Sequence, residues 1–182
     1  MRLATLVSLS VLALATTVGC SSKTDQPASG TASANATAAP DTASFCDTLC
    51  GRHSDCDHSQ DKQTCVSQCV SANAATLPKF RADLVSDAAA CVANADCHSV
   101  LDEDILGGCV KVILVSIAPD AETQKFCSDL EAVTAKCGNA VDYAGCLDTT
   151  KRFGDATLSQ AAACLDKACV QMADCVEAEL DL

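Results

Sequence analysis

The sequence predicts an all-α protein made of two tandem disulfide-stapled helical modules that are related by internal duplication. Three observations support this prediction. Cysteine is abundant, with 15 among 182 residues. The positions of Phe and Cys in the second half repeat those of the first half. Trp is absent and there is a single Tyr, so we expect a shallow core of Ala, Leu and Val that needs covalent support.

Residues 1–19 are predicted to form a signal peptide. Arg2 supplies a positive charge, and an apolar, uncharged run follows from Leu3 to Val18. A short run of this kind that ends in small residues is typical of an export signal and differs from a membrane span. We therefore expect the chain to reach an oxidising compartment, where disulfide bonds form and persist.

The residues Thr-Val-Gly-Cys at positions 17–20 resemble the lipobox of bacterial lipoproteins. This resemblance implies cleavage before Cys20, acylation of the Cys20 thiol and amine, and firm retention on a membrane. Ser21 follows, and in that family a non-acidic residue here implies transfer to the outer membrane. The alternative is a secretory signal cleaved elsewhere, which leaves Cys20 as an unpaired thiol. The chain is otherwise similar to uncharacterised cysteine-rich bacterial lipoproteins, a resemblance that implies no activity.

Residues 20–44 are predicted to be the acylated cysteine followed by a disordered tether. Positions 21–44 are nearly all Ser, Thr, Ala, Asp, Gly, Asn and Pro. Such a segment cannot bury enough apolar surface to offset its chain entropy. As a flexible chain it would hold the folded part roughly 25–30 Å from a bilayer.

The cysteines beyond Cys20 are predicted to form disulfide bonds. They are even in number and dense in a chain that carries an export signal, which is typical of a disulfide scaffold. No Cys-x-x-Cys motif is present in the sequence. This argues against a thioredoxin-type redox motif and against the usual zinc knuckles.

An internal repeat defines the two modules, which we place at residues 45–118 and 119–182. All four Phe residues of the chain occupy matched positions, which is the pattern expected of a duplicated unit. The matched pairs are Phe45 with Phe126, Cys46 with Cys127, Cys56 with Cys137, Cys65 with Cys146, Phe80 with Phe153, Cys91 with Cys164, Cys97 with Cys169, and Cys109 with Cys175.

The repeat also suggests partners for some cysteines. Cys50 and Cys69 lack counterparts, since Glu131 and Thr150 stand at the matching positions, so we predict that they pair with each other. Paired positions in an antiparallel helical hairpin keep a nearly constant sum of residue numbers, which adds two further predicted bonds, Cys56–Cys65 and Cys137–Cys146. Cys46 would then reach Cys91, Cys97 or Cys109, and the sequence leaves that choice open.

Most segments of the two modules favour helix. Helices are expected over residues 61–72, from 76–78 onward, from 119–120 to about 138, over 142–153 and over 158–179, on the basis of apolar spacing and cap residues. Residues 110–117 are apolar and β-branched, so they are expected to form either a strand or a buried helix end. We expect this segment to be buried where the modules pack.

One short segment carries residue types that could bind a metal ion. His53, Asp55, Asp57 and His58 lie within six residues, and imidazole and carboxylate groups are ligands for zinc or copper. The alternative is a solvated loop at a hairpin tip. In the second module Thr134, Lys136, Gly138 and Asn139 occupy the matching positions, so the loop has no need of metal to fold.

The segment Cys50-Gly51-Arg52-His53 resembles the Cys-x-x-His-Asp signature of secreted phospholipases A2. This resemblance implies a hydrolase with His53 as a base beside bound calcium. Ser54 stands where the calcium-binding Asp of that family should follow, and no glycine-rich calcium loop precedes it. The departures put in doubt the water activation and charge stabilisation that this chemistry requires.

Charge and motifs together favour a non-enzymatic function. The formal net charge is −12, and Lys151-Arg152 is the only adjacent basic pair, which argues against nucleic acid as a partner. We expect no catalytic residue and no cofactor. The sequence therefore predicts an outer-membrane lipoprotein, facing the periplasm or the cell surface. It would act as a binding or structural module with a protein or envelope partner, bound chiefly through residues 53–61. The alternatives are a phospholipase-like or metal-dependent hydrolase and metal capture.

Overall fold

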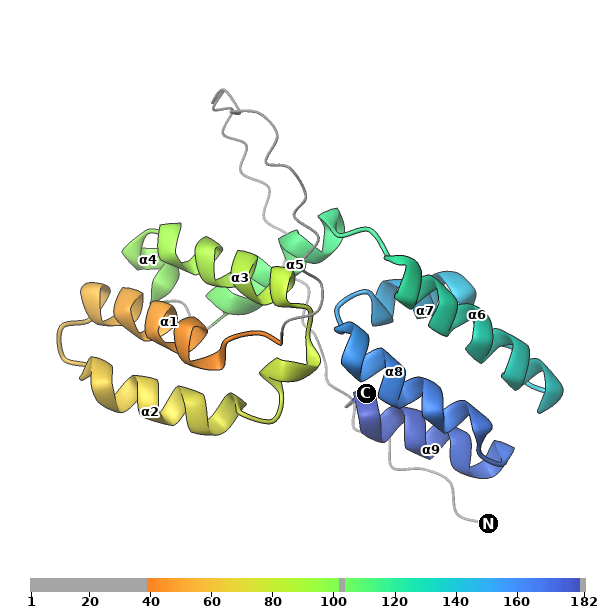
Figure 1. Ribbon diagram of the computed structural model, residues 1–182. Coiled ribbons are helices and arrows are strands. Elements are labelled where there is room, and N and C mark those ends of the chain that lie inside the picture. Colours follow the sequence, from red (N-terminus) through yellow and green to blue (C-terminus); the bar gives the residue numbers. More distant parts are fainter. Residues whose placement is uncertain (1–38, 102–103, 181–182) are drawn as a thin grey trace, which may run out of the picture. The chain divides into compact units, whose positions relative to one another are not determined.

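The computed structural model describes residues 39–101 and 104–180. The predicted signal peptide, Cys20 and most of the predicted tether lie outside these described residues. Within them, every regular element is a helix, apart from one isolated β-bridge (Figure 1). The all-α prediction is confirmed for this part of the chain. No helix in the same part is both long enough and apolar enough to span a membrane.

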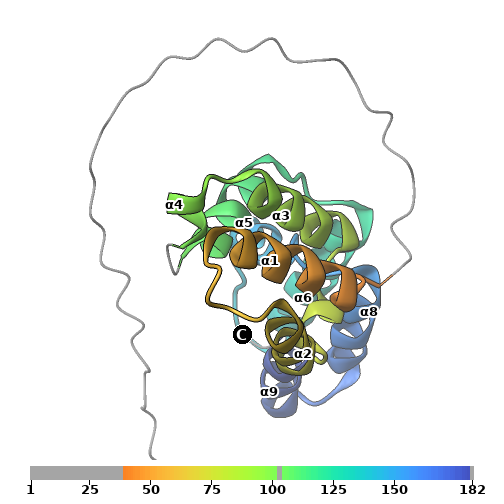
Figure 2. The ribbon, with the colours of Figure 1, turned by 90° about the vertical axis from the view of Figure 1, so that its left-hand side faces the viewer.

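The first half of the described chain contains α1 (Thr42–Cys56), α2 (Lys62–Asn73), the 3-10 turn η1 (Leu77–Lys79), α3 (Ala82–Asn94), α4 (Cys97–Val100) and α5 (Ile105–Ser116). Aspartate side chains begin several of these helices, because a carboxylate accepts hydrogen bonds from backbone N–H groups that the first turn leaves unpaired. Asp41 caps α1, Asp61 caps α2 and Asp96 caps α4. α1 lies between α2 and α3 (Figure 2), and α5 packs on α3.

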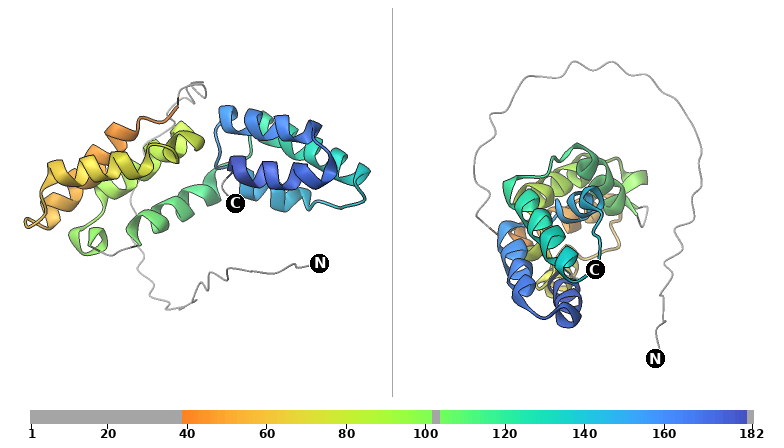
Figure 3. Two further views of the ribbon diagram at one scale, coloured as in Figure 1. Left: turned by 90° about the horizontal axis from the view of Figure 1, so that it is seen from below. Right: turned by 90° about the vertical axis from the view of Figure 1, so that its right-hand side faces the viewer.

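The second half contains α6 (Ala121–Lys136), α7 (Tyr143–Thr150), α8 (Asp155–Ala163), the 3-10 turn η2 (Cys164–Asp166) and α9 (Cys169–Leu180). α6 ends where predicted, since Gly138 follows it with φ of 78°, a left-handed conformation that glycine adopts without steric cost. The continuous helix expected over 158–179 is instead two helices. α8 and α9 lie side by side (Figure 3), because η2 turns the chain back on itself.

Seven disulfide bonds join the fourteen cysteines from Cys46 onward. Each bond stays within residues 45–118 or within residues 119–182, as predicted for modules that close on themselves. The bonds are Cys46–Cys69, Cys50–Cys65, Cys56–Cys97, Cys91–Cys109, Cys127–Cys146, Cys137–Cys169 and Cys164–Cys175.

The three predicted partnerships are wrong, although all six residues are disulfide-bonded. The structure contains no Cys50–Cys69, Cys56–Cys65 or Cys137–Cys146 bond. The prediction assumed that the two cysteines without counterparts pair with each other. Instead, two nested bonds, Cys46–Cys69 and Cys50–Cys65, join α1 and α2. The two residue numbers add up to the same sum in both bonds, as an antiparallel hairpin requires.

Cys56 and Cys137 each lie at the end of a long helix, which explains why they bond elsewhere. Cys56 is the last residue of α1, and it bonds Cys97, the first residue of α4. Cys137 caps α6 and bonds Cys169, the first residue of α9. Their predicted partners are bonded elsewhere, Cys65 to Cys50 and Cys146 to Cys127, so each of the two cysteines closes the far end of its half.

The prediction for residues 110–117 is also wrong in part. This segment is helical and belongs to α5, so the strand alternative fails. One side of α5 is buried against the first core through Cys109 and the half-buried Val110 and Ile113. The opposite side faces solvent, with Val112 72% exposed and Val115 83% exposed. The segment was expected to be buried, but of its five β-branched residues three are half-buried and two are exposed.

Two hydrophobic cores are present, one in each half. The first is built around Phe45, Leu77, Val85 and Ala88 with Cys46, and the second around Phe126, Phe153, Leu158, Ala161, Cys164, Leu165, Met172, Val176 and Leu180 with Cys127. Phe80 is half-buried and packs against both cores. It is therefore the apolar side chain that the two cores share.

Candidate functional site

The segment at residues 53–58 is more ordered than the predicted loop. His53 and Asp55 lie in the last turn of α1, and Asp57 is its C-cap. Only His58 and the residues up to Asp61 form a connection between α1 and α2. Arg52 donates hydrogen bonds from Nε (3.1 Å) and Nη2 to the carbonyl oxygen of Ala95. Together with the bond from Cys56 to Cys97, this holds the end of α1 against the turn between α3 and α4.

Two carboxylates stiffen the connection between α1 and α2. Asp57 Oδ1 accepts hydrogen bonds from the Ser59 hydroxyl (2.7 Å) and the Ser59 N–H (3.0 Å). Asp61 Oδ1 accepts the same pair of bonds from Thr64, at 2.7 and 2.8 Å. These hydrogen bonds to the charged form lower the pKa of both carboxyl groups below the usual value of 3.8. Both groups are therefore ionised and committed to local turns.

The four residues proposed as metal ligands do not form a metal site. His53 and Asp55 are two residues apart on a helix, so their side chains point to different sides. Asp57 is committed to Ser59. Across the described residues, no group of three His, Cys, Asp or Glu side chains is arranged to hold a metal ion. The metal-capture alternative therefore has no support in the geometry.

The phospholipase-like alternative receives no further support from the placement of its residues. Cys50 is bonded to Cys65 and is fully buried, and His53 is half-buried in the same helix. The Nδ1 atom of His53 is buried and has no hydrogen-bond partner in the described part of the chain. A general base needs a partner that orients it and an open path to its substrate. His53 is instead half-buried at the end of α1, with its Nδ1 atom turned away from solvent.

A shallow cleft of about 390 Å³ lies where α1 and α3 begin. Its walls are mostly small side chains, among them Ala82, Ser86 and Ala89, over a floor that includes Phe45 and Val85. Asp41 is the only ionisable residue in its lining, and its carboxylate accepts hydrogen bonds from the N–H groups of Ala43 and Ser44. The lining contains no His, Cys or Lys, and its one carboxylate is engaged in capping α1.

The two cores meet at a short pairing that the sequence did not reveal. Phe80 and Phe153 stack, with ring centroids 5.7 Å apart and an interplanar angle of 10°. They also form an antiparallel β-bridge. The Arg81 N–H donates to the Arg152 carbonyl (3.0 Å), and the Gly154 N–H donates to the Lys79 carbonyl (2.9 Å). The two hydrogen bonds flank the phenylalanine pair symmetrically, since each joins the residue after one Phe to the residue before the other.

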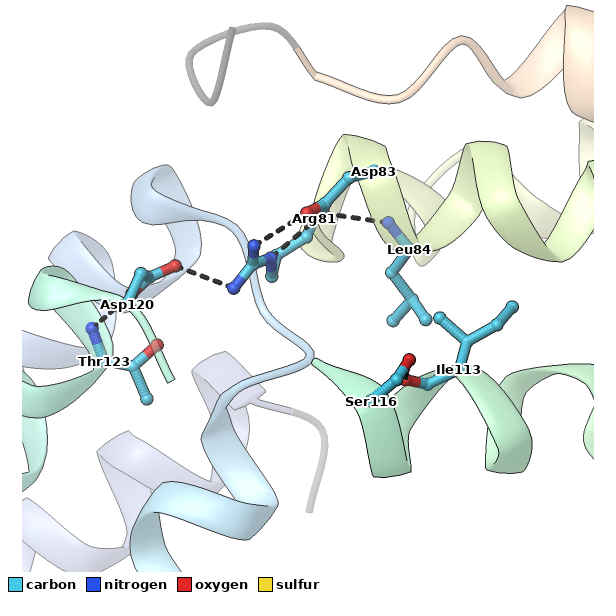
Figure 4. A network of polar contacts seen from close by, with 7 residues as sticks. All are labelled: Arg81, Asp83, Leu84, Ile113, Ser116, Asp120 and Thr123. Atoms are coloured by element: carbon cyan, nitrogen blue, oxygen red, sulfur yellow. Dashed lines mark hydrogen bonds and ion pairs between the residues drawn. The ribbon is translucent and has the colours of Figure 1, made fainter. Parts of the chain in front are cut away.

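An ion-pair network extends this junction (Figure 4). The Arg81 guanidinium contacts both oxygens of Asp83, at 3.0 and 2.7 Å, and Oδ2 of Asp120 at 2.9 Å. Asp120 also caps α6 by accepting from the Thr123 N–H at 2.8 Å. The hydrogen bonds from Arg81 lower the pKa of Asp83 below 3.8. Arg81 thus links the start of α3 to the start of α6, and no motif in the sequence pointed to it.

Comparison of the chain with family models, with curated proteins and with solved structures finds no match. The surface features that could contact a partner are therefore known only from the fold itself. They are the stiffened connection between α1 and α2, the cleft where α1 and α3 begin, the junction at Phe80 and Phe153, and the exposed apolar side of α5.

Proposed function

We propose that the protein is a lipid-anchored, non-enzymatic binding or structural module of the bacterial cell envelope. The observation that carries this proposal is the disposition of the cysteines. All fourteen cysteines from Cys46 onward are consumed in disulfide bonds. Cys20 is left over, and it follows directly on an apolar run and a lipobox-like segment. A disulfide scaffold of this density belongs in an oxidising compartment, and acylation gives the remaining cysteine a use there.

The anchor is tested by Cys20→Ser. Without the acylated thiol we expect the mature chain to leave the membrane fraction and become soluble, because several buried acyl chains are what makes attachment close to permanent. Metabolic labelling with palmitate should mark the wild type and not the variant. Ser21→Ala serves as the control and should stay lipidated and membrane-bound. A wild-type chain that is already soluble, or a variant that remains attached, contradicts the anchor.

We further propose that the two halves arose by duplication of one module. The disulfides support this, since Cys56–Cys97 and Cys137–Cys169 join matched positions, as do Cys91–Cys109 and Cys164–Cys175. The junction supports it too, since the matched residues Phe80 and Phe153 stack on each other. Equivalent residues meet in this way about a two-fold axis between identical units.

For the binding surface we propose the exposed part of the connection between α1 and α2, at residues 55–61. The connection is stiffened at both ends, by Cys56–Cys97 and by the Asp61 cap of α2. A stiffened segment loses less entropy when a partner binds. Asp55 and His58 are exposed, so they can be replaced without disturbing the packing of His53. The partner would be a protein or another component of the envelope.

The experiment is capture from envelope extracts by the wild type and by Asp55→Lys/His58→Asn, which introduces the residues found at positions 136 and 139 of the second half. We expect the double variant to lose the captured partner while its helical circular dichroism is unchanged. The matched control replaces Lys136 and Asn139 by the first-half residues and should retain binding. Equal capture by both variants contradicts the assignment. His53→Ala in an assay of phospholipid hydrolysis tests the hydrolase alternative, and we expect no activity in either form.

A further inference from the structure

The outward side of α5 differs from the other exposed helix faces of the molecule. Residues 108, 112 and 115 share one side of the helix, because they are spaced i, i+4 and i+7. All three are exposed, and they are Gly108, Val112 and Val115. Lys111 is the only charged residue between Ile105 and Ser116. This helix therefore presents an apolar strip to solvent in a chain whose formal net charge is −12.

The glycine in this strip has no role in the fold of its own chain. Gly108 lies in the interior of α5, where glycine is less favourable than alanine. Its φ is not positive, since Gly138 is the only described glycine with positive φ. A Cβ placed on Gly108 would meet no atom within 4 Å. A glycine in open space on an exposed helix side leaves room for the close approach of another backbone.

The last helix of the second half supplies an internal comparison. Cys175 on α9 bonds Cys164 as Cys109 on α5 bonds Cys91. Counted from these cysteines, the places of Gly108, Lys111 and Val112 are taken on α9 by Asp174, Glu177 and Ala178, which are all exposed. A solvent-facing helix in this position can thus carry acidic residues. At these three places α5 has a glycine, a lysine and a valine.

We propose that the outward face of α5 binds a second copy of this chain, in an antiparallel arrangement with a two-fold axis at Gly108. In that arrangement Gly108 of each copy lies at the helix crossing, where two glycines allow the closest approach. Residues on the same edge of the face, at nearly equal distances on either side of Gly108, lie beside each other. Lys111 comes three residues after Gly108, and Asp104 comes four residues before it. Lys111 of one copy therefore lies beside Asp104 of the other copy. Val112 lies beside Ile105 of the other copy.

Charge complementarity is the reason for choosing a second copy as the occupant. Asp104 is exposed, and its carbonyl accepts the Gly108 N–H as the first turn of α5 (2.9 Å), so it stands in register with the helix. Asp104 and Lys111 are seven residues apart, or about two turns, and they share one edge of the face. Two-fold symmetry makes the pair twice, on the same edge. The chain therefore carries both halves of its own recognition pattern.

A bilayer fits this face less well. Interfacial helices insert Trp, Phe and Leu and carry several basic residues, whereas this face has two valines, a glycine and one lysine.

The size of the face also sets the strength of the dimer. A helix of 12 residues is about 18 Å long, so the contact is smaller than the roughly 800 Å² per partner of a stable complex. The dimer is therefore weak in dilute solution, and tethering on a membrane would raise its effective concentration.

The test uses the full mature chain with Cys20→Ser, exported so that its disulfides form, and sedimentation velocity from about 5 to 500 µM. The affinity of interfaces this small justifies that range. We expect reversible dimers. Val112→Asp should weaken the dimer at least about tenfold, because it buries an unpaired carboxylate in the contact. Val115→Asp should weaken it less, because Val115 lies farther from the axis. Ala178→Asp, at the matching place on α9, is the control and should leave the dissociation constant unchanged.

Charge exchange tests the register. Lys111→Glu and Asp104→Lys should each impair dimer formation, because each places like charges together twice. An equimolar mixture of the two variants should dimerise at least as well as the wild type, because both pairs in the mixed dimer are again opposite. Helical circular dichroism and intact disulfides are required of every variant. Since the chain carries no lipid, the outcome does not depend on the proposed anchor.

Three results would overturn the proposal. They are a wild type that stays monomeric at about 500 µM, an association that Val112→Asp and Val115→Asp leave unchanged, and a mixture no tighter than either charge variant alone. Flotation of the unlipidated chain with phosphatidylethanolamine–phosphatidylglycerol vesicles, lost in Val115→Asp, would instead assign the face to a bilayer.

Discussion

Phe80 should couple the unfolding of the two halves of the molecule, and Phe80→Ala should separate them. The ring packs against both cores and stacks on Phe153. Complete burial of a Phe is worth about 3–5 kcal/mol against Ala, and we expect about 2–3 kcal/mol here because Phe80 is half-buried. The stack adds about 1 kcal/mol. The loss is therefore about 3–4 kcal/mol, most of it at the junction.

Each polar contact across the junction is weaker than the contribution of this ring. The two backbone hydrogen bonds between residues 79–81 and 152–154 contribute about 0.5–1.5 kcal/mol each. The ion pair between Arg81 and Asp120 is partly exposed and contributes at most about 1 kcal/mol. Phe80→Ala thus removes the largest single contribution to the coupling and leaves the backbone pairing in place.

The assay is guanidinium unfolding with the disulfides intact, followed by hydrogen exchange of peptides from α1 and from α6. The wild type should show one midpoint for both helices. In Phe80→Ala the two midpoints should separate, and each transition should have a smaller slope, because each exposes less surface. Val85→Ala is the control, since Val85 is buried in the first core alone. It should cost about 2 kcal/mol and keep a common midpoint.

Two outcomes would refute the reasoning. If α1 and α6 in Phe80→Ala still unfold together, the coupling does not pass through this ring. If they already unfold separately in the wild type, the halves are independent and the junction is only a contact.

Three further predictions concern the same fold. Arg81→Met should destabilise the chain above about pH 4, where Asp83 is ionised and paired. Because the pKa of Asp83 is lowered in the folded state by its hydrogen bonds to Arg81, this deficit relative to the wild type should shrink as the pH falls from 5 towards 3 in urea titrations. Gly154→Ala should cost about 1 kcal/mol, because its Cβ would lie 3.1 Å from the Phe80 carbonyl oxygen, whereas Gly51→Ala in α1 should be neutral or stabilising in a thermal melt. Full reduction should abolish cooperative unfolding by circular dichroism, since closing a loop such as Cys50–Cys65, with a separation of 15 residues, stabilises by about 3 kcal/mol; a cooperative melt of the reduced chain would show that the core alone suffices.

Parts of the candidate site could be predicted and parts could not. The end of α1 drew attention because His53, Asp55, Asp57 and His58 are close in sequence, but closeness along a helix places side chains on different sides. The Arg81 network joins residues 39 positions apart, and no local pattern marks such a contact. The exposed face of α5 did leave a signal in the sequence. Gly107-Gly108 inside an apolar helix is a visible departure from the residues that favour helix.

The sequence by itself determined the helices, their caps and the division of the cysteines between two halves of the chain. Aspartate caps and the glycine after α6 depend on neighbouring residues, and the repeated Phe and Cys positions are visible by comparing the two halves of the sequence. Tertiary structure decided which cysteines bond, which side of α5 meets solvent, and that Phe80 meets Phe153. Each of these depends on the distance between segments far apart in the chain. That distance follows from how helix faces pack, and a single sequence does not encode it at any one position.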